Sequence, residues 1–206
     1  APTTVLTNGT LIDAAMAELE VLSDPEMVRW QRAAMLDPAA PAPSVEAILH
    51  AIIPFPFVDH THADAVVAVS NTPDGLDRVR SIYGDTVLVI PYVMPGFDLA
   101  RLCAKLFPLQ ACAETIGMVL LNHGIFSFGD TAKESYDRMI SLVSRAEDFL
   151  RKNEAWDVSL RSAESRKVGL STQLARLRSD ISSVAGFPVI LARQGDARSL
   201  AFARLP

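Results

Sequence analysis

The sequence predicts a mixed α/β fold built around one main core. Amphipathic periodicity of about 3.6 residues recurs along the chain and is most regular between residues 131 and 152. Short continuous apolar runs at 86–90 and 117–121 lie between such segments, and turn or polar residues bound them, as is typical of strands buried on both faces. A chain of 206 residues, half of them hydrophobic, can bury a single substantial core.

Each predicted helix follows from its apolar spacing and its start signals. The helices expected from this spacing cover 11–22, 25–36, 45–53, 76–83, 131–152 and 172–184. Residues 24–26, Asp-Pro-Glu, offer a cap, a first-turn proline and an early acid to the second helix. Ser44 ends a Pro/Ala-rich loop and is expected to cap the third. Thr131 and Glu134 form a capping-box pattern that opens the long helix.

The predicted strands are short and bounded by turn residues. They cover 57–62, 86–90, 117–121, 125–129 and 188–192. The Asn-Thr-Pro-Asp-Gly turn at 71–75 separates the first strand from the next helix. Residues 154–170 are polar with little periodicity, and 200–205 form a further apolar segment. The sequence therefore predicts a main domain over 1–155 and a C-terminal extension over 156–206, a helix plus a short strand packed on the same domain.

Composition excludes several classes of protein. The net charge is −5, and Lys and Arg are scattered rather than gathered into a basic face, which argues against a nucleic-acid partner. There is no run of 18 apolar residues and no signal-peptide pattern, so no membrane partner is expected. Cys103 and Cys112 are too few for a disulfide framework and are interpreted as buried thiols of a cytoplasmic protein.

Three of the four histidines form the pattern of a metal site. His60 and His62 are two residues apart in a predicted strand, where alternate side chains point to one face, so both imidazoles can reach one ion. His123 follows a distant buried strand and can supply a third ligand. Three protein ligands with an open fourth position are typical of catalytic zinc. Glu46, beside the proline-bounded Ser44, adds a carboxylate to this set.

These motifs, in this order, resemble the class II aldolase/adducin family. The matching segments are Pro-Ser-Val-Glu at 43–46, His-Thr-His at 60–62, Pro-Tyr at 91–92 and Asn-His-Gly at 122–124. Their order and approximate spacing agree with the family from about residue 40 to residue 150. The resemblance implies a three-layer α/β/α fold with a central, mainly antiparallel sheet, commonly assembled as a homo-tetramer with active sites between subunits.

The resemblance also implies roles for individual residues. His60, His62 and His123 would hold Zn²⁺ or another divalent metal, Glu46 would act as the acid/base beside it, and Tyr92 would assist from a neighbouring subunit. The implied activity is reversible retro-aldol cleavage of a small phosphorylated sugar.

A narrower resemblance points to one substrate. The segments at 60–64, 71–75, 89–97 and 118–132 look like the aldolase half of bifunctional rhamnulose-1-phosphate aldolase/short-chain dehydrogenase proteins. This implies cleavage of a deoxyketose 1-phosphate to dihydroxyacetone phosphate and lactaldehyde, in rhamnose catabolism. The chain carries no dinucleotide fingerprint and no Tyr-x-x-x-Lys pair, so it is expected to be a fragment without the dehydrogenase half.

The chain departs from the family at the phosphate-binding loops. The upstream Gly-Asn-x-Ser loop and a second glycine-containing loop of the family are not found, and Val45 replaces a second serine, so Ser44 is the one phosphate-binding residue carried over. We expect upstream residues to be missing from the sequence rather than phosphate binding to be lost. Two alternatives stay open: the same site used for epimerisation or dehydration of a sugar phosphate, and an adducin-like scaffold without catalysis.

Overall fold

The structure, a computed structural model, describes residues 22–37, 39–156, 170–192 and 196–203. The chain divides into two compact units, residues 1–156 and residues 157–206. The first unit contains α2 (Asp24–Ala33), α3 (Ala47–Ile52), β1 (Phe57–Thr61), α4 (Asp64–Ser70), α5 (Gly75–Tyr83), a 3-10 turn (Gly84–Thr86), β2 (Val87–Ile90), α6 (Phe97–Gln110), β3 (Gly117–Leu120), β4 (Gly124–Gly129) and α7 (Ala132–Lys152). The second contains α8 (Leu170–Ala185) and α9 (Ala197–Phe202).

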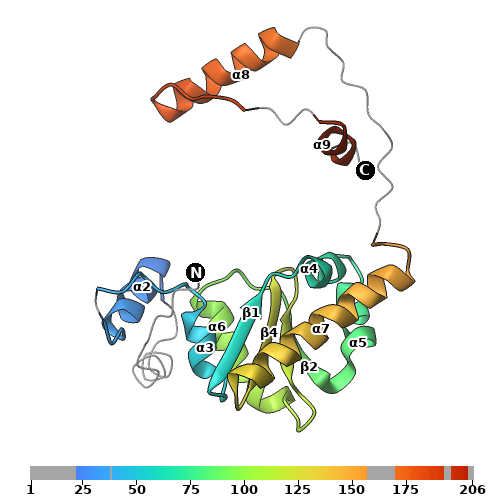
Figure 1. Cartoon of the computed structure of the whole chain (residues 1–206). Coiled ribbons are helices and arrows are strands. Elements are labelled where there is room, and N and C mark those ends of the chain that lie inside the picture. Colours follow the sequence, from blue (N-terminus) through green and yellow to red (C-terminus); the bar gives the residue numbers. More distant parts are fainter. Residues whose placement is uncertain (1–21, 38, 157–169, 193–195, 204–206) are drawn as a thin grey trace. The chain divides into compact units, whose positions relative to one another are not determined.

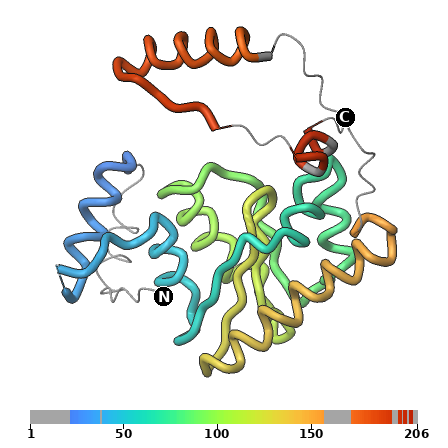
Figure 2. Tube along the Cα trace, turned by 45° about the horizontal axis from the view of Figure 1, so that its top comes forward, coloured from blue at the N-terminus to red at the C-terminus, as the bar shows by residue number. Residues whose placement is uncertain are grey.

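The four strands form one sheet in the order β1-β4-β3-β2. The β1–β4 and β3–β4 pairs are antiparallel, and the β2–β3 pair is parallel, so the sheet is mainly antiparallel as predicted. Figure 2 shows β1, in cyan, running beside β4, in yellow, although more than 60 residues separate them in sequence. His60 stands opposite Phe126 in this pair.

Helices cover both faces of the sheet, so the first unit has three layers (Figure 1). Because successive strand side chains point to opposite faces, the apolar strand residues divide into two sets. The set that packs against α2, α3 and α6 is Leu88, Ile90, Met118, Leu120, Phe126 and Phe128. The set that packs against α4, α5 and α7 is Val87, Val89, Val119 and Ile125. Burial on both faces explains why β3 is apolar throughout and why β4 has one polar side chain, Ser127, which is buried and donates to the Ser135 carbonyl.

The long helix α7 begins as its sequence predicts. The Thr131 side chain accepts a hydrogen bond from the Glu134 backbone N–H at 3.1 Å. The Glu134 carboxylate, however, accepts from the backbone N–H of Asp130 rather than from that of the cap itself.

Two predicted helix caps are wrong, one by one residue and the other by two. Ser23, not Asp24, caps α2 and forms a capping box with Glu26. Helix α3 begins at Ala47 with Glu46 as its N-cap, so Ser44 is not the cap. The Ser44 hydroxyl instead accepts from the Glu46 backbone N–H at 3.3 Å within the preceding turn.

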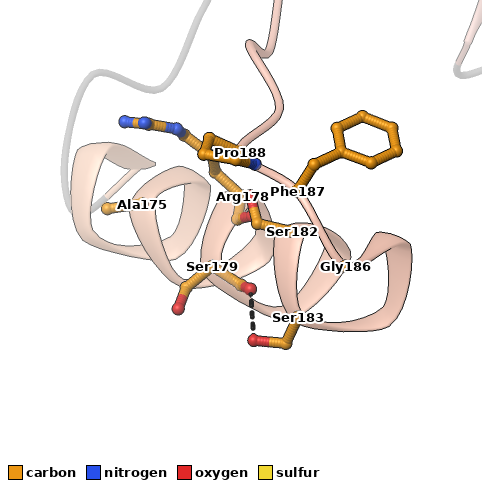
Figure 3. Close-up of a pocket in the computed structure, with 8 residues that line it drawn as sticks. All are labelled: Ala175, Arg178, Ser179, Ser182, Ser183, Gly186, Phe187 and Pro188. Atoms are coloured by element: carbon orange, nitrogen blue, oxygen red, sulfur yellow. Dashed lines mark hydrogen bonds between the residues drawn. The ribbon is translucent and has the colours of Figure 1, made fainter.

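The predicted strand at 188–192 is wrong. After α8 the chain turns at Gly186 and continues through Phe187 and Pro188 beside that helix (Figure 3). Its backbone pairs with side chains of α8 instead of another strand. The Val189 N–H donates to the Ser182 hydroxyl, and the Val189 carbonyl accepts from Arg178 Nε. Side chains thus satisfy the polar groups that a sheet would otherwise satisfy. An open groove of about 670 Å³ lies between α8 and residues 186–188.

Other predictions have mixed outcomes. Residues 11–21 of the first predicted helix lie outside the described residues. Of the two thiols interpreted as buried, Cys103 is buried but Cys112 is exposed, so that interpretation is wrong for Cys112. No helix within the described ranges is both long and apolar enough to cross a membrane.

Candidate metal centre

The three predicted histidines and Glu46 meet at one end of β1. His60 lies in β1, His62 follows the end of that strand, His123 lies in the loop between β3 and β4, and Glu46 caps α3. One ligand atom from each of the four lies within 4.8 Å of the others. The sheet pairing explains this convergence, because β1 and β4 are neighbours and both adjoin the β3–β4 loop.

Glu46 Oε1 stands at the centre of the group. It lies 2.6 Å from His123 Nε2, 3.5 Å from His60 Nε2 and 3.8 Å from His62 Nε2. All three imidazoles therefore present the same nitrogen toward one carboxylate oxygen. The His62 side chain is 59% exposed, whereas the other three range from 7% to 17%, so the site opens to solvent on the His62 side.

A backbone carbonyl fixes the orientation of His60. The Nδ1 of His60 lies 3.0 Å from the carbonyl oxygen of Ile125, which can only accept a hydrogen bond. Nδ1 must therefore carry a hydrogen, so Nε2 is the nitrogen whose lone pair can bind a cation. That Nε2 is buried and has no hydrogen-bond partner. The His60 ring also stacks on Phe126, with the ring centroids 4.0 Å apart, which further limits its rotation.

The loop that carries His123 needs an unusual backbone. Leu120 pairs with Gly124, so residues 121–123 form a three-residue connection between β3 and β4. Asn122 in this connection has φ of 60°. Asparagine is among the few residues other than glycine that adopt this left-handed conformation readily.

Gly124 has no side chain, and the imidazoles of His60 and His62 lie close to its Cα. A Cβ at this position would lie 2.7 Å from the Thr61 carbonyl oxygen, 2.8 Å from His62 Cδ2 and 3.0 Å from His60 Cε1. Any side chain here would push into the two imidazoles. The glycine of the Asn-His-Gly motif is thus required by a close approach in the site itself.

The electrostatics keep the carboxylate ionised. The nearby imidazole of His60 is the main cause that lowers the pKa of Glu46 to about 2, against an opposing effect of burial. Burial is also the main cause that lowers the pKa of His123, and the Glu46 carboxylate opposes it. Near neutral pH Glu46 is therefore ionised, and it accepts a hydrogen bond from His123 Nε2, 2.6 Å away. A bound cation would take the place of that hydrogen.

This donor set fits a divalent cation. Imidazole nitrogen and carboxylate oxygen are the ligands of tetrahedral zinc, whose bonds of about 2.0–2.1 Å place ligand atoms about 3.4 Å apart. The distances of 2.6–3.8 Å from Glu46 Oε1 to the imidazole nitrogens span that value. The unpartnered, buried Nε2 of His60 gives independent support, since buried polar atoms normally have a partner.

The side-chain hydrogen bonds found for Tyr92 and Ser44 do not reach the four ligand atoms. Tyr92 follows β2, is 53% exposed, and its hydroxyl lies 3.8 Å from Met94 Sδ. Ser44 is exposed, and its hydroxyl and carbonyl oxygen both accept hydrogen bonds inside the protein.

One residue beside the site was missed by sequence reasoning. Gln31, on α2, is 1% exposed, and its side-chain nitrogen donates to the backbone carbonyls of Ser44 and Val45. The signal was available, because Gln31 lies one turn after Met27 on the buried stripe of that helix. A long polar side chain on such a stripe must find a buried partner.

Comparisons with known proteins agree with this fold and site. The family model described as "Class II Aldolase and Adducin N-terminal domain" matches residues 3–150. The "Uncharacterized oxidoreductase YuxG" of Bacillus subtilis (strain 168) is 34% identical over 129 residues, which are 63% of this chain but only 18% of that protein. The chain therefore corresponds to a small part of that relative.

A solved structure extends the likeness to three dimensions. The N-terminal Class II Aldolase domain of a conserved protein from Thermoplasma acidophilum matches with a TM-score of 0.65 and 41% sequence identity. The match covers 71% of this chain and 66% of the other. With the layered fold and the four clustered ligand atoms, these findings confirm the resemblance: the chain belongs to the class II aldolase and adducin family.

Proposed function

We propose that this chain is a zinc-dependent aldolase domain that cleaves a deoxyketose 1-phosphate, of the rhamnulose-1-phosphate kind, to dihydroxyacetone phosphate and lactaldehyde. The observation that carries the proposal is the convergence of three imidazole Nε2 atoms on the ionised Glu46 carboxylate in a chain of this family. A metal site open on the His62 side leaves room for a substrate.

His60, His62 and His123 would hold the metal. When bound, a divalent ion would supply Lewis-acid stabilisation of negative charge on the substrate's carbonyl oxygen. The Ile125 carbonyl contributes by keeping the His60 Nε2 lone pair directed into the site. Gly124 contributes by letting both imidazoles of the His-Thr-His segment approach the loop.

Glu46 would move the proton. Retro-aldol cleavage breaks one carbon–carbon bond, takes a proton from the hydroxyl that becomes the aldehyde, and returns a proton to the carbon that carried the enediolate. A carboxylate that stays ionised and lies within 4 Å of every ligand nitrogen is placed to exchange a proton at that carbon. Tyr92 would exchange the proton at the aldehyde oxygen.

We assign that role to Tyr92 of a second subunit, because Tyr92 is exposed and its hydroxyl pairs with Met94 rather than with a ligand residue of its own chain. We therefore propose a homo-oligomer, a tetramer by family resemblance, in which Tyr92 of one subunit serves the site of the next. Ser44 would bind the substrate phosphate together with groups that lie upstream in family members. The name of the Bacillus relative supports a longer protein in which a dehydrogenase accompanies the aldolase domain.

Product analysis tests the proposed reaction. We expect zinc-loaded protein to release dihydroxyacetone phosphate from L-rhamnulose 1-phosphate, detected by coupled reduction with glycerol-3-phosphate dehydrogenase, and Glu46→Gln to lose at least about 100-fold in kcat. A pentulose phosphate that is epimerised, or a sugar phosphate that is dehydrated, by the same protein would overturn the aldolase assignment. Zinc-loaded protein inert toward all these substrates would favour a non-catalytic scaffold.

A further inference from the structure

The buried side-chain amide of Gln31 forms hydrogen bonds with the turn that carries Glu46. Gln31 Nε2 lies 3.1 Å from the Ser44 carbonyl oxygen and 3.3 Å from the Val45 carbonyl oxygen. An amide nitrogen has two hydrogens, so it can donate to both carbonyls at once. These carbonyls belong to the two residues directly before Glu46.

The turn depends on such outside support. Helix α3 has only six residues, and a helix this short is too weak by itself to fix the residue at its start. Within the turn, the Ser44 hydroxyl accepts from the Glu46 N–H, and the Ser44 carbonyl also accepts from the Ala47 N–H at 3.0 Å. Gln31 ties this local network to α2, a different helix in the same layer.

Burying the Gln31 amide costs free energy, and packing alone does not explain why a polar side chain lies here. Gln31 Oε1 is buried and has no hydrogen-bond partner. Met27, one turn earlier, fills the same buried stripe with an apolar side chain. A methionine at position 31 would avoid the unpaired oxygen and keep nearly the same volume. What an apolar side chain could not do is hold the two carbonyls.

We propose that Gln31 is a positioning residue for Glu46: from α2 it fixes the 44–46 turn, and thereby sets where the carboxylate stands relative to His60, His62 and His123. This inference rests on the proposed function in one respect, since it takes Glu46 as the group that moves the proton. Gln31 touches neither substrate nor metal, and it acts only through the turn.

Kinetics of Gln31→Met and Glu46→Gln, singly and combined, test the proposal. We expect Gln31→Met to lower kcat by about 10- to 100-fold, as a misplacement of about 1 Å does, with KM and zinc content unchanged. The double variant should lose no more than Glu46→Gln alone, because both changes remove the same function. Arg32→Met, an exposed neighbour on α2, serves as the matched control and should keep wild-type kcat. Losses that multiply in the double variant would make Gln31 merely structural and overturn the proposal.

A spectroscopic readout is independent of catalysis. The visible absorption of the Co²⁺-loaded protein reports the geometry of the groups around the ion, so Gln31→Met should shift the spectrum toward that of Glu46→Gln. A wild-type spectrum in Gln31→Met would overturn the proposal. If the wild-type protein has no aldolase activity, the proposed function fails, and this spectrum still decides the role of Gln31. Should Gln31→Met fail to fold, Gln31→Asn withdraws the same donor by one methylene and carries the same expectation.

Discussion

At the scale of single residues, backbone groups orient the histidines of the candidate metal centre. The Ile125 carbonyl selects the tautomer of His60, and the stacked Phe126 ring holds its plane. Gly124 supplies the space into which two imidazoles fit. The liganding side chains therefore lose little further freedom on binding a cation, and a preorganised site of this kind binds more tightly than a loose one.

Replacing Gly124 by alanine tests that close approach. The added Cβ meets the Thr61 carbonyl oxygen and the imidazoles of His60 and His62 at 3.0 Å or less, so we expect a loss of about 1–3 kcal/mol in the free energy of unfolding and a weaker zinc affinity. Urea denaturation and calorimetric zinc titration measure the two effects.

Gly84→Ala is the matched control. Gly84 also resists substitution, because its φ is 54°, but nothing lies within 4 Å of its Cβ position. The Gly84→Ala variant should therefore be less stable than the wild type but should keep wild-type zinc affinity. Equal affinities in Gly124→Ala and wild-type protein would contradict the role given to Gly124.

The two thiols should differ sharply in reactivity. Burial raises the pKa of Cys103 to about 12, whereas Cys112 is exposed. Since the thiolate is the reactive form, we expect a thiol reagent at pH 8 to label Cys112 rapidly and Cys103 only after unfolding. Mass spectrometry of the native and urea-treated protein counts the labels. Equal labelling rates at both residues in the native protein would contradict the burial of Cys103.

At the scale of elements, the β3–β4 hairpin supplies one ligand residue and two groups that hold or make room for the others. It delivers His123 in its loop, Gly124 at the start of β4, and the Ile125 carbonyl one residue later. Strand β1 then adds the other two histidines through its pairing with β4. A change in the loop should therefore disturb the metal centre as well as the sheet.

Substitutions at Asn122 test the loop. Asn122 is exposed and has φ of 60°, so its replacement acts mainly through the backbone. We expect Asn122→Val to cost about 1–2 kcal/mol in unfolding free energy and to weaken zinc binding, because a β-branched residue strains this conformation. Asn122→Gly should fold and bind zinc like the wild type. Indistinguishable behaviour of the valine and glycine variants would exclude a backbone requirement.

The sequence predicted the elements that carry regular burial patterns and missed those where tertiary packing overrides local preference. Strands β1 to β4 lie within one residue of their predicted bounds, since their turns and apolar runs are local signals. Helix α4 was missed because its valine-rich sequence favours strand, and it is helical because Ala65, Val66 and Val69 pack against the layer of α5 and α7. Helix α6 was missed because it has no polar cap and contains Pro108.

The ligand residues of the candidate site could be predicted because they lie in short sequence motifs. The spacing of His60 and His62 and the apolar strand before His123 indicated a shared ligand set, and the structure brings all three together with Glu46. The contributions of Gln31 and of the Ile125 carbonyl depend on which elements become neighbours in space. Sequence spacing alone carries no such information without the strand order.

At the scale of the whole molecule, the three-layer unit brings together four side chains of one chain that could hold a metal ion, whereas the proposed reaction requires two chains. Helices on both faces bury the sheet, and the ligands emerge at one end of it. Tyr92 lies exposed after β2, and its hydroxyl pairs with Met94. A homo-oligomer is the arrangement that would bring Tyr92 to a neighbour's site.

Mixing two inactive variants tests the shared site. Tyr92→Phe and Glu46→Gln each lose activity, but a hybrid assembly contains interfaces where an intact Glu46 faces an intact Tyr92. We expect co-refolded chains in equal amounts to recover activity at about a quarter of the sites, the value for random assortment in a symmetric oligomer. Activity no greater than the sum of the two variants would place Tyr92 in its own chain's site or outside catalysis.

The most direct test of the account is the metal content of the protein. We expect protein purified without chelators, or titrated with zinc after chelation, to bind one zinc ion per chain with a raised melting temperature, since a ligand of the folded state stabilises it. His62→Ala and His123→Ala should weaken binding severely, whereas His50→Ala, which removes the histidine outside the cluster, should bind like the wild type. Wild-type protein that binds no stoichiometric zinc or other divalent ion, or equal binding by the His62→Ala and His50→Ala variants, would contradict the central claim.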